Sequence, residues 1–224
     1  MKGMGKTTAI VSAFVTCALW LAPSVLSARQ SSPSPSAAEL ARSLQAHYNT
    51  VRDFTADFTH TYRGGALKQT FNERGDVRVK KPGRMFWTYT APDKKEFISD
   101  GSKIFSYMIA DKVVYVSPIP PGNETSTAVL FLTGRGDLTR DFKTSVPSAQ
   151  PEAEWVLDLT PNTPQPDFVS LKLTVDRKSL ALRGLTSVDQ QGGTSAFTFT
   201  NLRENVGLTD NQFTFKVPRG VEVR

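Results

Sequence analysis

The sequence predicts a mainly β protein with helices, in which a strongly curved antiparallel sheet has helices laid across it. Three observations support this prediction. Apolar and polar residues alternate in residues 54–62 and in the late segments 169–176 and 213–217, with the period of strands that have one buried face. Glycine and proline turn signals separate these segments at hairpin-like distances. Two helical segments carry apolar surface that needs a partner.

Residues 1–28 are predicted to be a secretory signal peptide. Two lysines precede an apolar run over residues 9–21, and small residues suited to cleavage follow it. A membrane span needs about 20 apolar residues, so a span is the less favoured interpretation. We expect residues 29–36, rich in proline and serine, to form a flexible lead, and residues 37–224 to form a single domain.

The bulk composition argues against several classes of function. The one cysteine, Cys17, lies in the predicted signal peptide, so we expect a mature chain without disulfides or thiolate chemistry. Loss of Lys2 and Lys6 lowers the formal net charge from +6 to +4. This positive charge is diffuse, which gives little support for nucleic-acid binding and fits weak attraction to acidic partners or membrane surfaces.

A helix is predicted to begin at Ser36, because Ser36 and Glu39 have the spacing of a capping box. Apolar residues then recur at helical intervals and form one stripe on a polar cylinder. These residues are Leu40, Leu44, Tyr48 and Val51. The helix therefore needs a surface to lie on.

Strands are predicted to follow from residue 54. In residues 54–62, Phe54, Ala56, Phe58, His60 and Tyr62 alternate with threonines and Asp57. The predicted turns are Gly64-Gly65, Gly75-Asp76, Pro82-Gly83, Asp100-Gly101 and Gly192-Gly193. Two late strands also alternate, with Val169, Leu171, Leu173 and Val175 on one face of the first, and Phe213, Phe215 and Val217 on one face of the second.

Residues 85–89 form an unusual predicted strand, because large apolar groups stand on both of its faces. A strand points successive side chains to opposite sides. One face carries Met85, Trp87 and Tyr89, and the other carries Phe86 and Thr88. Segments 104–109 and 113–116 have the same two-faced apolar character.

A short helix is predicted over residues 128–132, after a capping residue at Ser126 and before a stop at Gly134. A short helix that is apolar all round must be enclosed. Two interpretations remain open. The helices fill an ordinary core beneath the sheet, or they cover a trough that holds a ligand.

No motif for catalysis or metal binding is present in the sequence. His47 and His60 fall in different predicted elements without zinc-ligand spacing, so we expect structural roles, no metal and no cofactor. The sequence contains neither a nucleophile elbow nor a phosphate-binding glycine loop. We therefore expect a protein that is not an enzyme, although a catalytic pair can still assemble through space.

Four stretches that together span nearly the whole mature chain carry a likeness to a known family. They are "VRDFTADFTHTY" (51–62), "GDVRVKKPGRMFWTYTAPDKKEFISDGSKIFSYMIADKVVYV" (75–116), "TAVLFLTGRGDLTRDF" (127–142) and "NQFTFKVPRGVEV" (211–223). In this order they resemble the LolA family, the periplasmic carriers of bacterial lipoproteins. The resemblance implies an unclosed antiparallel β-barrel, or half-barrel, with an α-helical lid over a hydrophobic cavity.

The resemblance also implies site residues. The acyl cavity is expected to be lined by Phe58, Met85, Trp87, Tyr89 and Met108, and the lid is expected to carry Val129, Leu130 and Phe131. Family members commonly have an arginine before the proline of the central segment, where it ties the lid shut. Here that position is Lys81, which lacks the planar guanidinium fork, so Lys81 and nearby Arg84 are the two candidates for the lid clamp.

The resemblance finally implies a function and partners. A periplasmic carrier accepts the acyl chains of lipoproteins released by an inner-membrane ABC transporter and delivers them to an outer-membrane receptor. We expect a monomer that binds no nucleic acid. The alternatives are a lipoprotein receptor of related fold, which needs a lipidated cysteine, a lipoprotein sensor, and a secreted hydrolase. Intact mass would reveal lipidation, and co-purifying lipids or lipoproteins would identify a carrier.

Overall fold

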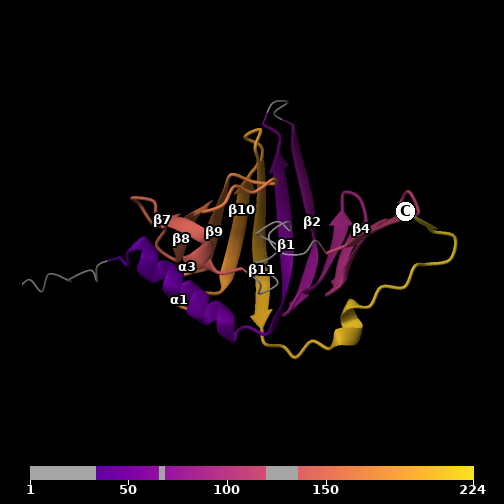
Figure 1. The fold of residues 1–224 in the computed structure, drawn as a ribbon, viewed down its shortest axis with the longest axis horizontal. Helices are drawn as coiled ribbons and strands as arrows, with labels where there is room; N and C mark the ends of the chain where they lie inside the picture. Colours follow the sequence, from indigo (N-terminus) through magenta and orange to yellow (C-terminus); the bar gives the residue numbers. More distant parts are fainter. Residues whose placement is uncertain (1–33, 66–68, 120–135) are drawn as a thin grey trace, which may run out of the picture. The chain divides into compact units, whose positions relative to one another are not determined.

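The computed structural model describes residues 34–65, 69–119 and 136–224, of which residues 35–224 form one compact unit. These residues form a twelve-stranded sheet with the order β12-β6-β5-β4-β3-β2-β1-β11-β10-β9-β8-β7 (Figure 1). The strands are β1 (Asp53–Arg63), β2 (Thr70–Lys80), β3 (Arg84–Ala91), β4 (Lys95–Asp100), β5 (Lys103–Met108), β6 (Val113–Pro118), β7 (Phe142–Ser145), β8 (Glu154–Pro161), β9 (Ser170–Asp176), β10 (Leu182–Val188), β11 (Thr194–Glu204) and β12 (Glu222–Val223).

The sheet is open, because its edge strands β7 and β12 are not paired with each other in the described part of the chain. Neighbouring strands are antiparallel except for β12, which pairs with β6 in parallel. The prediction of a mainly β, unclosed antiparallel sheet is therefore confirmed. The predicted helix over residues 128–132 lies outside the described residues.

Helix α1 (Ala37–Thr50) begins where the sequence predicts it. The Glu39 backbone N–H donates to Ser36 Oγ at 3.3 Å, and the Ser36 backbone N–H donates to Glu39 Oε2 at 2.9 Å. This is a complete capping box. The buried residues of α1 are Leu40, Ala41, Leu44 and Tyr48.

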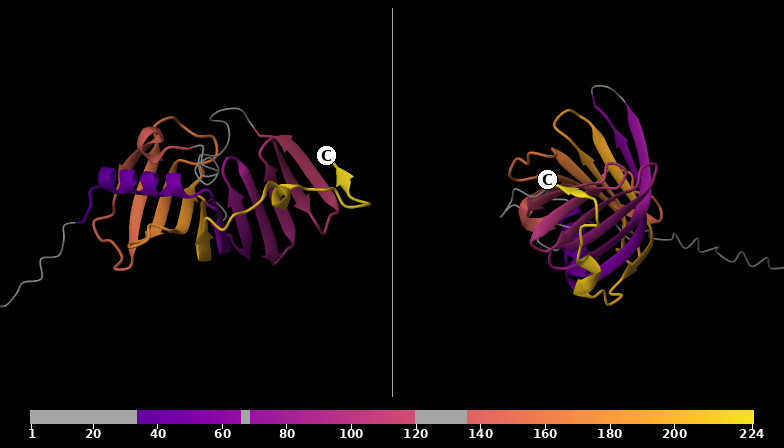
Figure 2. Two further views of the ribbon diagram at one scale, coloured as in Figure 1. Left: turned by 90° about the horizontal axis from the view of Figure 1, so that it is seen from below. Right: turned by 90° about the vertical axis from the view of Figure 1, so that its right-hand side faces the viewer.

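Helix α1 contacts β7 and β8 and lies across one face of the sheet (Figure 2, left). We call this face the inner face. The main hydrophobic core lies on the inner face, where α1 packs over its β7 and β8 end, and includes Phe54, Phe58, Trp87, Leu173 and Leu185. The short helix α3 (Leu138–Asp141) also contacts α1.

Strand β3 is apolar on both faces because each face has its own cover. Met85, Trp87 and Tyr89 point to the inner face and belong to the main core. On the outer face, the 3-10 helix η2 (Asp210–Phe213) contacts β3 and β4. Phe213 and Ile98 are buried there, at 1% and 0% exposure. The segment after β11 therefore supplies the second apolar layer.

The predicted strand over residues 213–217 is wrong. Phe213 ends η2, and residues 214–218 form no regular structure. Phe215 instead packs against the outer face, with its ring centroid 5.4 Å from Phe105 and 5.8 Å from Tyr107. The alternation in this segment reflects packing onto a sheet face rather than pairing at a sheet edge.

Two smaller predictions were also wrong. Val169 precedes β9 and is 41% exposed, so it does not share the buried face of the strand. The predicted turn at Gly75-Asp76 lies in the middle of β2. The other four predicted turns do connect strands.

Candidate functional site

Six aromatic side chains on the inner face form a continuous cluster, largely within the main core, which we call the aromatic floor. Its members are Phe58, Trp87, Tyr89, Phe97, Phe197 and Phe199. The Phe58 ring centroid lies 5.1 Å from that of Trp87 and 4.9 Å from that of Tyr89. Both pairs are edge-to-face, an arrangement that aromatic rings favour. The floor therefore brings together three of the predicted cavity residues, which come from β1 and β3.

Gly75 makes the contact between Phe58 and Tyr89 possible. It lies on β2, between the two strands, and pairs with Phe58 on one side and Tyr89 on the other. A methyl group at this position would lie 3.0 Å from the Phe58 ring and 1.8 Å from the Thr88 carbonyl oxygen. The register of β2 against β3 shifts at the same place. Glycine in a strand marks such a close approach.

The inner face continues from the floor onto β4, β5 and β6. Met85 belongs to the main core beside the floor. Met108 faces the same side as Tyr89, because both pair with Lys95 of β4. Met108 and Ile104 are only half-buried by the described residues. The described residues therefore leave this part of the inner face partly uncovered.

Of the two predicted clamp residues, only Lys81 reaches a helix on the inner face. Its ammonium donates to the backbone carbonyl of Tyr48 near the end of α1 and lies 3.3 Å from the centroid of the Tyr48 ring. Arg84 instead pairs with Asp210 of η2, at 3.3 Å. The predicted lid residues Val129, Leu130 and Phe131 lie outside the described residues, so the clamp role of Lys81 stays a prediction.

Burial lowers the pKa of Lys81 to about 8, and the nearby Glu204 carboxylate opposes this shift. Unfolded lysine titrates near 10.5, so the folded state releases this proton first. The cost of burying the charged ammonium is fully present below pH 8 and disappears as the pH rises to 10.5.

We therefore expect the destabilising effect of the buried Lys81 charge to decrease progressively between pH 8 and 10.5. The difference in free energy of unfolding between the native protein and the Lys81→Met variant should shift in favour of the native protein over this range. Urea unfolding at several pH values measures this difference. A difference that stays constant with pH would contradict the assignment.

A row of four polar side chains crosses the inner face beside the floor. We call it the polar row: Lys95, Glu73, His60 and Ser195. Lys95 Nζ donates to Glu73 Oε1 at 2.5 Å, and the other carboxylate oxygen, Oε2, lies 2.9 Å from His60 Nδ1. His60 Nε2 lies 2.8 Å from Ser195 Oγ, and the imidazole stacks on Phe197 at 4.1 Å between centroids.

The hydrogen bonds within the polar row keep Glu73 ionised. Burial alone would raise its pKa, but the donors Lys95 and His60 outweigh burial and hold the pKa below its ordinary value. Because a carboxylate only accepts, His60 donates from Nδ1 to Glu73, and in the neutral imidazole Nε2 then accepts the hydroxyl proton of Ser195. The sequence did not reveal Glu73, Lys95 or Ser195 as partners, although the β1–β2 register places Glu73 directly opposite His60.

Ser195, His60 and Glu73 follow one another in the order of a nucleophilic triad. Such a triad also needs two free N–H donors for the oxyanion. Ser195 lies in a central strand and pairs with Tyr62 on one side and Ser187 on the other. Its own backbone N–H is therefore committed to the sheet and is not free to serve as an oxyanion donor.

The remaining histidine, His47, lies 3.1 Å from Glu204 Oε1 at the junction of α1 and β11. Nowhere in residues 34–65, 69–119 and 136–224 do three or more His, Cys, Asp or Glu residues gather in a way that suits a metal ion. In the same residues, no helix has the length and apolarity that a membrane span requires.

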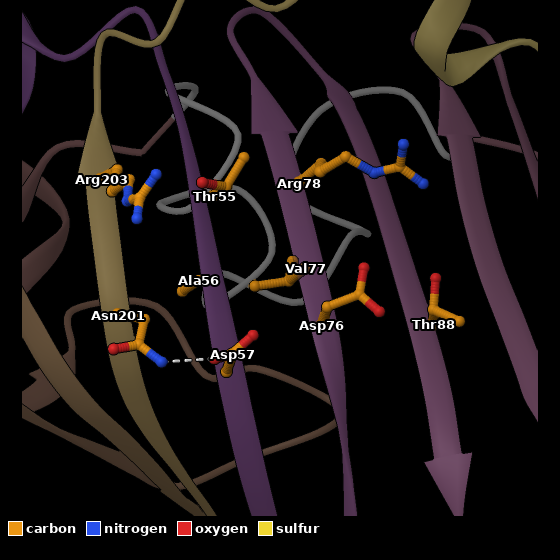
Figure 3. A pocket seen from close by; sticks show the side chains of 9 residues that line it. All are labelled: Thr55, Ala56, Asp57, Asp76, Val77, Arg78, Thr88, Asn201 and Arg203. Carbon is orange, nitrogen blue, oxygen red and sulfur yellow. Dashed lines mark hydrogen bonds between the residues drawn. The ribbon is translucent and has the colours of Figure 1, made fainter.

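A pocket of about 610 Å³ opens on the outer face, opposite the floor (Figure 3). Its polar lining comes from Thr55, Asp57, Asp76, Arg78, Thr88, Asn201 and Arg203. Asn201 Nδ2 donates to Asp57 at 2.6 Å (Figure 3). Carboxylates and guanidinium groups do not suit an apolar ligand, so the inner face is the candidate site.

Comparisons with known proteins give one consistent result. Residues 49–216 match the family described as outer membrane lipoprotein carrier protein LolA. An outer-membrane lipoprotein carrier protein of Chromohalobacter salexigens is 31% identical over 184 residues, which cover 82% of this chain and 85% of that protein. The protein of the same description from Nitrosomonas europaea is 26% identical over 193 residues, covering 85% of this chain and 91% of that protein.

The fold is also found among solved structures. An uncharacterized conserved protein from Thermus thermophilus superposes with a TM-score of 0.52 at 12% sequence identity. The match covers 82% of this chain and 98% of that one. At this identity the likeness concerns the fold alone.

Proposed function

The chain belongs to the LolA family, and from that premise we propose that it is a periplasmic carrier that holds the acyl chains of lipoproteins against the inner face of its sheet. The lipoproteins would be released by an inner-membrane ABC transporter and delivered to an outer-membrane receptor. Binding and release are sufficient for this function, and no reaction is proposed.

One observation carries the proposal: the aromatic floor continues into an apolar surface on β4 to β6 that the described residues leave half-buried. Burial of lipid contributes about 0.8 kcal/mol per CH₂, and a single chain binds only marginally. A lipoprotein anchor with several chains therefore needs an extended apolar surface. Methionines such as Met85 and Met108 adapt to chains of different shape.

Release requires that another group covers the apolar surface when the acyl chains leave. We propose that Val129, Leu130 and Phe131 of the predicted lid occupy the apolar surface when no cargo is bound, and that Lys81 takes part in holding the lid. The lid and the acyl chains would then compete for the same surface. Such competition keeps the affinity for cargo below its maximum, which a carrier needs.

Titration with a fluorescent fatty-acyl probe tests the proposal. We expect the native protein to bind the probe and the Met108→Glu variant to bind it about tenfold or more weakly, because the acyl chain would have to desolvate a carboxylate. Val116→Glu is the matched control. Val116 is also half-buried and lies on the neighbouring β6, but faces the outer side, since it pairs with Phe105. The Val116→Glu variant should bind the probe as tightly as the native protein does.

Met108 is not part of the main core, so both variants are expected to fold, and circular dichroism checks this. Equal probe binding by folded Met108→Glu and by the native protein would count against the inner face as the acyl site. An absence of binding by the native protein would count against the carrier function.

A further inference from the structure

Lys95 is the one charged residue on the inner face of the described strands β3 to β6. The register places Lys95 between Tyr89 and Met108, and the side chains on this face are otherwise apolar or hydroxyl-bearing. Lys95 Nζ lies 4.5 Å from the centroid of the Tyr89 ring and 5.8 Å from that of Phe97. A cation therefore stands at the point where the aromatic floor meets the half-buried apolar surface.

The ammonium of Lys95 is available to a ligand. It has three N–H donors, and one of them donates to the Glu73 carboxylate. The Lys95 side chain remains 24% exposed. Glu73 has a second partner, because His60 binds its other oxygen at 2.9 Å. When Lys95 turns to a ligand, Glu73 therefore keeps a hydrogen-bond donor and is not left as an unpaired buried charge.

We propose that Lys95 is the polar anchor of the acyl site: its ammonium binds the carbonyl oxygen at the head of an acyl chain while the chain lies over Phe97, Ile104 and Met108. This inference rests on the proposed function and names the chemistry that the site recognises. Two ligands share that chemistry. One is a free fatty acid, which presents a carboxylate, and the other is the ester-linked anchor of a lipoprotein.

Displacement of a fluorescent acyl reporter tests the anchor. The competitors are a fatty acid, its methyl ester and a plain hydrocarbon of equal chain length, together with a diacylated lipopeptide. In Lys95→Met we expect the fatty acid to bind about tenfold more weakly and the ester about threefold, because a charged hydrogen bond to each is lost. The hydrocarbon should bind as it does to the native protein.

Two control variants sharpen the test. Lys94→Met removes the same charge from the exposed neighbouring residue and should leave all four affinities unchanged. Lys95→Arg retains a cationic donor and should retain the preference for a carbonyl head over hydrocarbon. Weaker binding of the lipopeptide to Lys95→Met would assign the anchor to lipoproteins, whereas an effect on the fatty acid alone would assign it to free fatty acids.

The proposed anchor and the proposed function fail in different ways. If every competitor displaces the reporter equally well from Lys95→Met and from the native protein, Lys95 is not the anchor and the carrier function is untouched. If the reporter does not bind the native protein at all, the carrier function itself is contradicted.

Discussion

Replacement of Gly75 by alanine is expected to destabilise the protein by about 3 kcal/mol or more. The added methyl group would lie 1.8 Å from the Thr88 carbonyl oxygen, and a backbone atom cannot move away as the end of a flexible side chain can. Strands β2 and β3 would have to separate, and the contact of Phe58 with Tyr89 would open. Urea unfolding followed by circular dichroism measures the loss.

Gly64→Ala is the matched control, because among the described residues the nearest atom to a methyl group there is 3.7 Å away, an ordinary contact. Its free energy of unfolding should stay within about 1 kcal/mol of the native value. Equal stability of Gly75→Ala and Gly64→Ala would contradict this prediction. It would show that β2 can shift at no cost, so the close approach at Gly75 does not require a glycine.

Truncation of Trp87 to alanine should also have a large effect, about 3–5 kcal/mol of lost stability. Trp87 is 9% exposed, and its ring contacts Phe58, Phe197 and Phe199 of the floor. Its removal leaves a cavity in the middle of this cluster. The same variant should bind the acyl probe more weakly, because the floor loses its largest ring.

Trp155→Ala is the control for Trp87→Ala, because it removes a tryptophan from outside the aromatic floor. Trp155 is half-buried on β8, where the Arg177 guanidinium lies 3.8 Å from the centroid of its ring. Its truncation should cost less stability and leave probe binding unchanged. A folded Trp87→Glu variant with unchanged binding would count heavily against the floor as the acyl site.

Features that depend on neighbouring residues in the chain could be predicted from the sequence. The capping box of α1 needs only Ser36 and Glu39, and the two faces of β3 follow from alternation alone. The turn predicted at Gly75 is wrong because a glycine marks either a turn or a close strand approach, and the choice depends on Phe58 and Thr88 from other strands.

Features that depend on strand register could not be predicted. Lys95 and Ser195 meet in one hydrogen-bonded row only because β4, β2, β1 and β11 fold side by side. Likewise, residues 213–217 alternate as a strand does, but they pair with no strand. The Phe215 ring instead packs on the outer face of β5. Sequence patterns do not record which distant element supplies the partner.

The short parallel strand β12 has a consequence for self-association. An open sheet exposes a row of unpaired backbone groups at each edge, which invites another copy to add its own strand. Residues 222–224 occupy that row along β6: the Glu222 N–H donates to Lys112, the Arg224 N–H donates to Val114, and Val116 donates to Arg224, all at 2.9 Å. The opposite edge, β7, is only four residues long. In the part of the chain that the structure describes, both edges are thus poor templates for edge-to-edge polymerisation.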